Sequence, residues 1–369
     1  MRRAGEFRVT DLYVGLMSGT SLDGVDAALV DFSRSPGRLV ASRFAPYPEP
    51  IRAEALALNS PGDDELARSA LLANRLSGEY AAAVRELLAA AGIDRTQVAA
   101  IGCHGQTVRH RPDLGYTVQL VNGALLAELT GLPVVCDFRN RDVAAGGQGA
   151  PLVPAFHAAC FAAAERRRVI ANIGGIANIT CLRPGEPVRG FDTGPGNALL
   201  DLWAARHRGE PFDRDGVWAA SGKVVDELLR AMLAEPFFAL PPPKSTGRDL
   251  FNAAWLARFA PERNAPADVQ ATLAALTATS IADAVEHTGG EEVFVCGGGA
   301  SNAHLMRTLA AALPGVRVAS TAGVGLDPDW VEAMGFAWLA REALAGRDGS
   351  VPEVTGASGA RVLGAIYPA

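Results

Sequence analysis

The order of apolar and polar positions along the chain is typical of an α/β protein. Short apolar runs bounded by Gly, Asp and Ser predict strands, and longer segments with apolar residues three and four positions apart predict helices. In the first half, the predicted strands are 12–17, 25–32, 38–44, 98–103, 117–121 and 134–138. A long helix is predicted from Asp63 or Asp64, as its N-cap, to Gly92, and a short one over 124–130. This alternation predicts a mainly parallel sheet.

The same order of elements restarts in the second half, which predicts a second lobe built like the first. Its predicted strands are 169–173, 178–182, 188–191 and 292–296, and its predicted helices are 197–206, 223–233, 269–287 and one that Ser301 would cap. Because no low-complexity linker divides the chain, the order of elements sets the predicted boundary: an N-terminal lobe, 1–148, and a C-terminal lobe, 149–369. We expect the ligand in a cleft between the lobes.

Composition limits the classes of function. The 369 residues are 49% hydrophobic with a net charge of −6, so neither nucleic acid nor an acidic membrane surface is an expected partner. The start of the chain has no uninterrupted apolar segment, which predicts a cytoplasmic protein and an extension before Leu12. The cysteines are scattered, which favours reduced core residues: Cys103, Cys136, Cys160, Cys181 and Cys296.

Three glycine-rich turns follow predicted strands and are suited to phosphate groups, because glycine lets a backbone N–H approach an anion closely. They are 19–26, 174–175 and 297–299. In the first turn, Thr20 and Ser21 offer hydroxyl donors, and Asp23 or Asp26 could hold hydrated Mg²⁺; an ordinary hairpin turn is the alternative. The third turn precedes a predicted helix N-terminus and leaves room for a base and ribose. No segment has the Gly-x-x-x-x-Gly-Lys-Ser/Thr pattern, which excludes a P-loop kinase.

The segment 190–197 places Asp192 at the end of an apolar strand, where a carboxylate could take a proton from an attacking water or hydroxyl. A helix cap is the alternative role for Asp192. Arg139 or Arg141 could bind a substrate carboxylate, unless the two form local ion pairs in a solvated loop. A polar rim for sugar hydroxyls is predicted at His104, Gln106 and Thr107. We disfavour a nucleophilic Cys103 and a metal site at His157 and Cys160, because their neighbours do not supply convergent partners.

Taken together, these motifs resemble the anhydro-N-acetylmuramic acid kinase family of the hexokinase, Hsp70 and actin-like ATPase superfamily. The resemblance rests on the segments 15–26, 146–154, 190–197 and 244–248, and it continues to residues 363–368. It implies a two-lobed, ribonuclease H-like fold with a central cleft, and a homodimer. It also implies a reaction in which water opens the 1,6-anhydro ring while O6 receives the γ-phosphoryl of ATP with Mg²⁺.

The resemblance also implies roles for single residues. Asp192 corresponds to the base that activates water, and by looser alignment Glu332 is similar to a carboxylate on the substrate side. The residues implied for ATP are Gly19, Thr20, Ser21, Leu22, Asp23, Gly24, Val25, Asp26, Gly174, Gly175, Gly297, Gly298 and Gly299. Two alternatives stay open: an anhydrosugar hydrolase that uses Asp192 and Glu332 as paired carboxylates, and a sensor that binds nucleotide or muropeptide without turnover.

Overall fold

The chain divides into two compact units in this computed structural model, which describes residues 11–19, 21–34, 37–248 and 250–369. Unit 1 comprises Met1–Cys160 and Glu332–Ala369, and unit 2 comprises Phe161–Val331. This division differs from the predicted lobes 1–148 and 149–369, because the last part of the chain returns to unit 1. The predicted extension before Leu12 and the predicted donor Thr20 lie outside the described residues, apart from Asp11.

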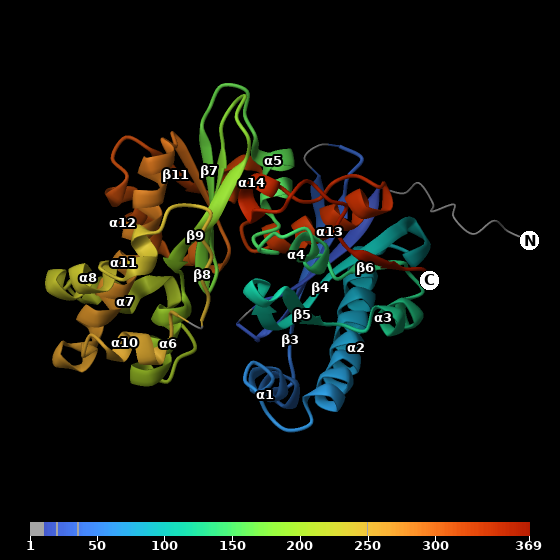
Figure 1. Cartoon of the computed structure of the whole chain (residues 1–369), viewed down its shortest axis with the longest axis horizontal. Coiled ribbons are helices and arrows are strands. Elements are labelled where there is room, and N and C mark those ends of the chain that lie inside the picture. The colour runs from blue at the N-terminus through green and yellow to red at the C-terminus, as the bar shows by residue number, and fades with distance from the viewer. Residues whose placement is uncertain (1–10, 20, 35–36, 249) are drawn as a thin grey trace, which may run out of the picture. The chain divides into compact units, whose positions relative to one another are not determined.

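Unit 1 is built on a mixed sheet with the strand order β12-β6-β4-β1-β2-β3, of which β3, β4 and β6 are labelled in Figure 1. Strands β1, β2 and β3 are antiparallel neighbours, whereas β4 is parallel to β1 and β6 is parallel to β4. β5 and β12 pair antiparallel with β4 and β6. The bounds are β1 (Leu12–Ser18), β2 (Gly24–Asp31), β3 (Arg38–Pro46), β4 (Val98–Arg111), β5 (Tyr116–Leu120), β6 (Val134–Cys136) and β12 (Ala365–Tyr367).

Helices cover both faces of this sheet. Val14 and Leu16 of β1 share an apolar core with α2 (Glu65–Ala91), which runs beside the sheet in Figure 1. Because side chains alternate along a strand, Gly15 faces the opposite side. There a Cβ on Gly15 would lie 1.8 Å from the Ala333 carbonyl oxygen of α13 (Val331–Leu344). Helix α13 therefore packs directly on the backbone of β1, which explains why the C-terminal segment belongs to unit 1.

The remaining helices of unit 1 are shorter. They are α1 (Glu49–Ala57), α3 (Gly123–Thr130), α4 (Asn140–Ala144), α5 (Pro154–Phe161) and α14 (Pro352–Thr355). Of these, only α3 is predicted by the sequence pattern. The others are short or, like α1, lack a strong apolar stripe, so periodicity gives little signal for them.

Unit 2 repeats the strand order of unit 1, as β11-β10-β7-β8-β9. β7, β8 and β9 are antiparallel neighbours, and β10 and β11 continue in parallel from β7. The bounds are β7 (Arg168–Ile173), β8 (Ile176–Leu182), β9 (Arg189–Pro195), β10 (Glu292–Cys296) and β11 (Arg317–Ser320). The sheets are mixed rather than mainly parallel, but the repeated order confirms the predicted α/β fold class with two similarly built lobes.

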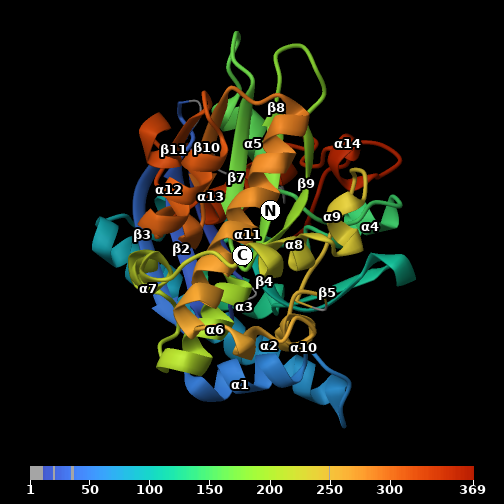
Figure 2. The ribbon, with the colours of Figure 1, turned by 90° about the vertical axis from the view of Figure 1, so that its left-hand side faces the viewer.

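One face of the unit 2 sheet is covered by α11 (Pro266–Thr288) and α12 (Ala303–Ala312), and Figure 2 shows α11 crossing in front of the strands. A second apolar core lies among α11 and the helices that follow β9. These are α6 (Ala198–Arg208), α7 (Val217–Ser221), α8 (Asp226–Leu233), α9 (Pro236–Ala239) and α10 (Ala253–Ala257).

Two local predictions are wrong. The strand predicted to end at Cys103 continues as β4 to Arg111, so His104, Gln106 and Thr107 lie within it. The N-cap of α12 is Asn302 and not Ser301, because the side chain of Asn302 accepts from the Leu305 N–H, at 2.9 Å. Ser301 ends a short 3-10 turn that precedes this helix.

Candidate functional site

The turn between β1 and β2 has exposed polar side chains and is supported by buried residues. Ser21 and Asp23 are exposed, and the Ser21 hydroxyl donates to the Asp23 carboxylate at 2.5 Å. Leu22 is buried and has φ of 59°, so it supports the turn and its side chain is turned into the core. Gly24 and Val25 are buried on β2, and Asp26 there is half-buried. The exposed polar surface of this turn is therefore narrower than the predicted stretch 19–26.

A buried network of hydrogen bonds lies beneath this turn. Tyr47 donates its hydroxyl to Ser18 Oγ at 2.6 Å, and Ser18 Oγ donates to Gln106 Oε1 at 2.5 Å. Gln106 Nε2 donates to the carbonyl oxygens of Gly19 and Thr107, each at 3.2 Å. Gln106 is 0% exposed, so its amide bonds to the protein itself rather than to solvent. The register Ser18↔Gln106 between the parallel strands β1 and β4 brings these residues together.

His104 connects the same turn to Arg139. Its Nδ1 lies 3.2 Å from the Ser18 carbonyl oxygen, and its Nε2 accepts from Arg139 Nε at 3.0 Å. The ring packs against Phe336 of α13, with centroids 4.8 Å apart. Burial, followed by the charge of Arg139, lowers the pKa of His104 to about 3. The imidazole is therefore neutral at physiological pH and cannot serve as a cation there.

Arg139 is held from a second direction by the glycine-rich loop that follows α4. Its Nη1 donates to the Gly149 carbonyl oxygen at 2.7 Å. The Gly149 N–H in turn donates to the carboxylate of Asp142 at 2.8 Å, and Thr355 donates its hydroxyl to the other oxygen of Asp142, also at 2.8 Å. Asp142 is 0% exposed, and sequence reasoning did not single it out. Its partner Thr355 is 213 positions away, so no local pattern indicated its role.

The other predicted sugar contacts are Thr107, Arg141 and Glu332, and they are less closely connected by hydrogen bonds to the turn. Thr107 is half-buried, and its hydroxyl accepts from Gln119 Nε2 at 3.2 Å. Arg141 is exposed on α4. Glu332 lies in the first turn of α13, four positions before Phe336, so both occupy one side of that helix. The structure thus joins His104, Gln106 and Arg139 by direct bonds, and places Glu332 on the helix that packs against His104.

In unit 2, three glycine-containing segments that are far apart in the sequence converge. The N–H groups of Gly196 and Asn197 donate to the carbonyl oxygens of Gly175 and Gly174, at 2.9 and 2.8 Å. A Cβ on Gly196 would lie 2.2 Å from the Gly174 oxygen, so glycine is required for this approach. The predicted second phosphate turn therefore rests on the start of α6.

The third glycine segment joins this group from the end of β10. A Cβ on Gly297, which has φ of 77°, would lie 2.5 Å from the side-chain oxygen of Asn172. Gly298 is exposed nearby, 3.7 Å from Asn197 Nδ2 when measured from the position of a Cβ. Gly299 is buried against Ile173. The three segments thus form one small, glycine-lined region at the ends of β7, β9 and β10.

Asp192 lies within β9, opposite Asn178 of β8, and is 8% exposed. Its Oδ2 accepts from the Thr246 N–H at 2.9 Å and from the Ser245 hydroxyl at 3.1 Å. The helix after β9 begins at Ala198 with Asn197 at the N-cap position, so Asp192 does not cap it. Asp192 is thus a largely buried carboxylate whose orientation is fixed by a separate segment of unit 2.

That segment, 244–248, is one of those that carry the family resemblance, but sequence reasoning gave it no role. Lys244 Nζ donates to the carbonyl oxygens of Phe237 and Phe238, at 3.2 and 3.1 Å, which anchors the segment to α9. The Lys244 carbonyl oxygen accepts from the Asp192 N–H at 3.1 Å. Burial lowers the pKa of Lys244, while the nearby Asp192 acts in the opposite direction. The polar Lys-Ser-Thr sequence at the start of the segment 244–248 is the signal by which sequence reasoning could have found it.

Burial favours the neutral forms of the Cys103 and Cys136 thiols and of the His157 imidazole. Burial raises the pKa of Cys136 to about 12 and also raises that of Cys103, so neither is a ready thiolate. Burial lowers the pKa of His157 to about 3, as expected for a core histidine. Among the described residues, no group of three or more His, Cys, Asp and Glu is arranged to hold a metal ion.

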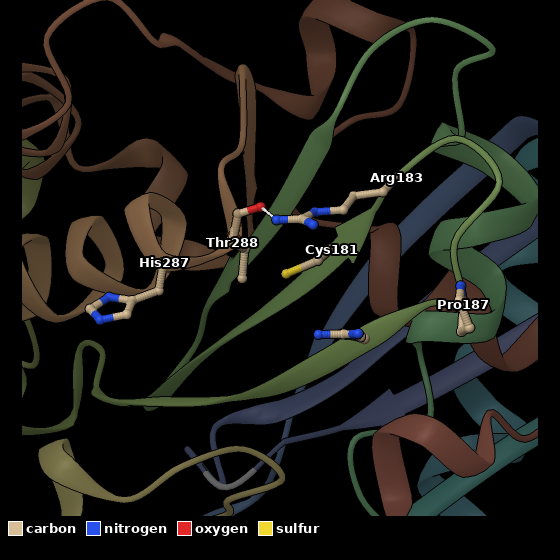
Figure 3. Close-up of a pocket in the computed structure, with 6 residues that line it drawn as sticks. Cys181, Arg183, Pro187, His287 and Thr288 are labelled. Carbon is tan, nitrogen blue, oxygen red and sulfur yellow. Dashed lines mark hydrogen bonds between the residues drawn. The ribbon is translucent and has the colours of Figure 1, made fainter.

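A small cavity of about 50 Å³ opens at the C-terminal end of β8 (Figure 3). Arg183 donates there to the Thr288 carbonyl oxygen at the end of α11, so the guanidinium caps that helix. The lining contains none of the predicted site residues: it consists of Cys181, Arg183, Pro187, Arg189, His287 and Thr288.

None of the helices in the described part of the chain is long and apolar enough to cross a membrane.

Comparisons with known proteins address the family directly. The model of the family "Anhydro-N-acetylmuramic acid kinase" matches residues 11–369. An anhydro-N-acetylmuramic acid kinase from Thiobacillus denitrificans is 56% identical, with 97% of each chain covered. One from Nitrosomonas europaea is 54% identical, with 97% of this chain and 99% of the relative covered.

Among solved structures, a ROK family glucokinase from Streptomyces griseus in complex with glucose and AMPPNP has a TM-score of 0.44 at 15% identity, with 90% of this chain and 99% of that chain covered. This likeness is too distant to carry an argument about function. The family match and the identities above 50% are decisive by themselves. The chain belongs to the anhydro-N-acetylmuramic acid kinase family.

Proposed function

We propose that the protein uses ATP and water to convert 1,6-anhydro-N-acetylmuramic acid into N-acetylmuramate 6-phosphate and ADP, a step of cell-wall recycling. Water adds to C1, the bond from C1 to O6 breaks, and O6 takes the γ-phosphoryl group of ATP. The observation that carries the proposal is the oriented, largely buried carboxylate of Asp192, in a chain that belongs to this kinase family.

Asp192 is the base in this proposal. Two hydrogen bonds to Oδ2, from the Thr246 N–H and the Ser245 hydroxyl, fix the plane of the carboxylate before substrate arrives. A base that is already oriented loses little entropy when it removes the proton from water. The proton passes to the carboxylate, and the remaining hydroxide forms the new bond to C1.

The nucleotide contacts that we propose follow the glycine turns. In unit 1, Gly19, Ser21 and Asp23 belong to the turn between β1 and β2, and Ser21 and Asp23 are exposed. In unit 2, the region formed by 174–175 and 297–299 provides backbone that a ligand can approach closely, because its residues lack side chains. We assign the phosphates to the first two turns and the adenosine to the third.

Magnesium is part of the proposal, and the exposed carboxylate of Asp23 fits it. Mg²⁺ prefers one or two carboxylates together with substrate phosphates and water, rather than a full protein cage. A lone exposed aspartate on a phosphate turn matches that preference. Bound there with ATP, the ion would neutralise charge on the phosphate groups.

For the sugar, we propose Arg139, Arg141, Thr107 and Glu332 as contacts in unit 1. A guanidinium matches the carboxylate of the lactyl group in a bidentate way, which favours an arginine there. Arg139 is the better supported of the two, because His104 and Gly149 hold its side chain in place. His104 and Gln106 differ from these residues because both are buried and every polar atom of their side chains bonds to the protein.

We also propose a homodimer that works in the cytoplasm. The cytoplasm supplies ATP, and buried thiols such as Cys103 and Cys181 suit a reducing compartment. Light scattering on the purified protein tests the dimer: a mass near that of one chain, 38.4 kDa, would contradict it.

The reaction is tested by product analysis. Purified protein with the anhydrosugar, Mg²⁺ and ATP should give the 6-phosphosugar by mass spectrometry, with one oxygen from ¹⁸O-labelled water at C1. Omitting ATP should stop both ring opening and phosphorylation. Release of unphosphorylated N-acetylmuramic acid without ATP would indicate a hydrolase, and binding of both ligands without any product would indicate a sensor.

A further inference from the structure

The hydrogen bonds of His104 define its tautomer. The Ser18 carbonyl oxygen can only accept, so the Nδ1 that faces it at 3.2 Å carries the proton. Arg139 can only donate, so Nε2, which lies 3.0 Å from its Nε, has no proton and accepts. Both ring nitrogens are therefore used within the protein, and the residue is 4% exposed. Neither ring nitrogen of His104 is left for a sugar hydroxyl.

The polar atoms of Gln106 are used in the same way. Oε1 accepts from Ser18 Oγ at 2.5 Å, and Nε2 donates to the Gly19 and Thr107 carbonyl oxygens. Tyr47 completes the arrangement, because its hydroxyl donates to Ser18 Oγ and so directs the serine proton toward Gln106. Ser18 and Gln106 are 1% and 0% exposed. Bonds in such a dry environment hold geometry firmly, and a broken one is costly.

These bonds fix the direction of the peptide groups at the start of the turn. His104 holds the Ser18 carbonyl oxygen, and Gln106 holds the Gly19 carbonyl oxygen. In a trans peptide the C=O and the following N–H point to opposite sides. With the Ser18 carbonyl oxygen directed toward His104, the Gly19 N–H points away from the buried network. An inward-facing carbonyl thus yields an outward-facing donor of the kind that phosphate oxygens need.

We propose that His104 and Gln106 are positioning residues rather than substrate contacts, and that one buried imidazole orients both the nucleotide turn and the sugar-binding Arg139. The inference rests on the proposed function for the names of the two ligands. Gln106 acts on the turn alone, through Ser18 and Gly19. His104 acts on both sides, through Nδ1 to Ser18 and through Nε2 to Arg139. Loss of one nitrogen should therefore affect one ligand and not the other.

Two substitutions separate the two nitrogens of His104. An asparagine amide lies near the position of Nδ1, and a glutamine amide reaches the position of Nε2. His104→Asn keeps a donor to the Ser18 carbonyl oxygen and loses the acceptor for Arg139. His104→Gln keeps an acceptor for Arg139 and loses the donor to Ser18. Ser77→Ala is the matched control, because Ser77 is also a buried serine of unit 1 whose hydroxyl bonds to backbone, at Asn122.

The experiment measures two dissociation constants by isothermal titration calorimetry, one for ADP with Mg²⁺ and one for 1,6-anhydro-N-acetylmuramic acid, each ligand alone. His104→Gln should weaken ADP binding at least about fivefold and leave the sugar constant within about twofold. His104→Asn should do the opposite. Tyr47→Phe and Ser18→Ala should weaken ADP binding only, and Ser77→Ala should change neither constant.

Equal losses for both ligands in both His104 variants would indicate a general structural role and overturn the inference. Loss of sugar binding alone in both variants would indicate direct contact and also overturn it. Unchanged constants would do the same. These binding constants do not depend on turnover, so a wild-type protein that binds both ligands but forms no phosphosugar would overturn the proposed function and leave this inference standing.

Discussion

The two units share one strand order but build their candidate site regions in different ways. In unit 2, backbone meets backbone: the N–H groups of Gly196 and Asn197 reach the carbonyl oxygens of the turn at 174–175, and glycines permit the close approach. In unit 1, side chains hold the turn: Tyr47, Gln106 and His104 reach it from elsewhere in the chain. Equal topology therefore does not impose equal chemistry on corresponding turns.

The difference has a consequence for how each region responds to change. A glycine-lined turn is sensitive to added atoms, because its neighbours are backbone and cannot move aside cheaply. A turn held by buried side chains is sensitive to removed atoms, because each lost partner leaves a polar group unsatisfied. The proposed base, Asp192, lies in unit 2, where backbone contacts shape the glycine turn.

The largest effect is expected from Asp192→Asn, which tests whether the chemistry depends on unit 2. Turnover should fall at least about a hundredfold while ADP still binds, because the amide keeps the shape of the side chain and cannot take the proton. Initial rates and calorimetry measure the two properties. Asp213→Asn is the control: this carboxylate likewise accepts two hydrogen bonds within unit 2, from the Trp218 and Ala219 N–H groups, and its loss should leave turnover unchanged. Near-normal turnover of Asp192→Asn would contradict the proposal that Asp192 is the base.

Gly196→Ala tests whether the turn at 174–175 depends on close backbone approach. The new Cβ would lie 2.2 Å from the Gly174 carbonyl oxygen, so the free energy of unfolding should fall by about 1–3 kcal/mol and ADP should bind more weakly. Urea unfolding and calorimetry measure these quantities. In Gly323→Ala, also in unit 2, the nearest atom lies 3.8 Å from the Cβ, so stability should change by less than about 0.5 kcal/mol. Equal results for both variants would refute the packing argument.

Acid should weaken the protein through the deeply buried histidines of unit 1. His104 and His157 have pKa values of about 3 when folded, against an ordinary 6.5. Between these values the unfolded chain binds protons that the folded chain does not, so stability is full above about pH 6.5 and falls as the pH is lowered. At pH 5 each of these histidines should lower the free energy of unfolding by about 2 kcal/mol.

Denaturant unfolding of wild type and His157→Leu at pH 7 and pH 5 tests this. The variant should lose about 2 kcal/mol less than wild type over that interval, since carboxylates common to both proteins contribute equally. An identical loss in both proteins would show that His157 is protonated in the folded state.

The smallest effect is expected from Ser245→Ala, which removes one of the two bonds that orient Asp192. The Thr246 N–H, at 2.9 Å, stays in place because it is backbone, so kcat should fall only about threefold to tenfold while KM for ATP stays constant. Ser221→Ala is the control, because its hydroxyl in unit 2 bonds to the Trp218 carbonyl oxygen, away from Asp192. A rise in KM for ATP without a fall in kcat would contradict an effect on the base.

Local signals in the sequence were enough for most of the fold and for the family. These signals are apolar periodicity, helix stops such as Gly92, and glycine-rich turns. Each involves residues that are close together in the chain, so it can be recognised from the sequence. The restarted order of elements predicted two similar lobes, which the strand orders confirm. The motifs at 15–26, 146–154, 190–197 and 244–248 predicted the kinase family, which the match over residues 11–369 confirms. That family match gives no support to the hydrolase or the sensor.

Tertiary structure alone decided which polar residues are buried and what they hold. Gln106 meets Ser18 across 88 positions and Thr355 meets Asp142 across 213, and parallel strand pairing and chain return, not local pattern, create such contacts. The return of α13 to unit 1 likewise depends on Gly15, whose lack of a side chain matters only once a helix lies on it. A sequence shows that His104 and Gln106 are polar, but only packing determines whether their hydrogen bonds go to ligand or to protein.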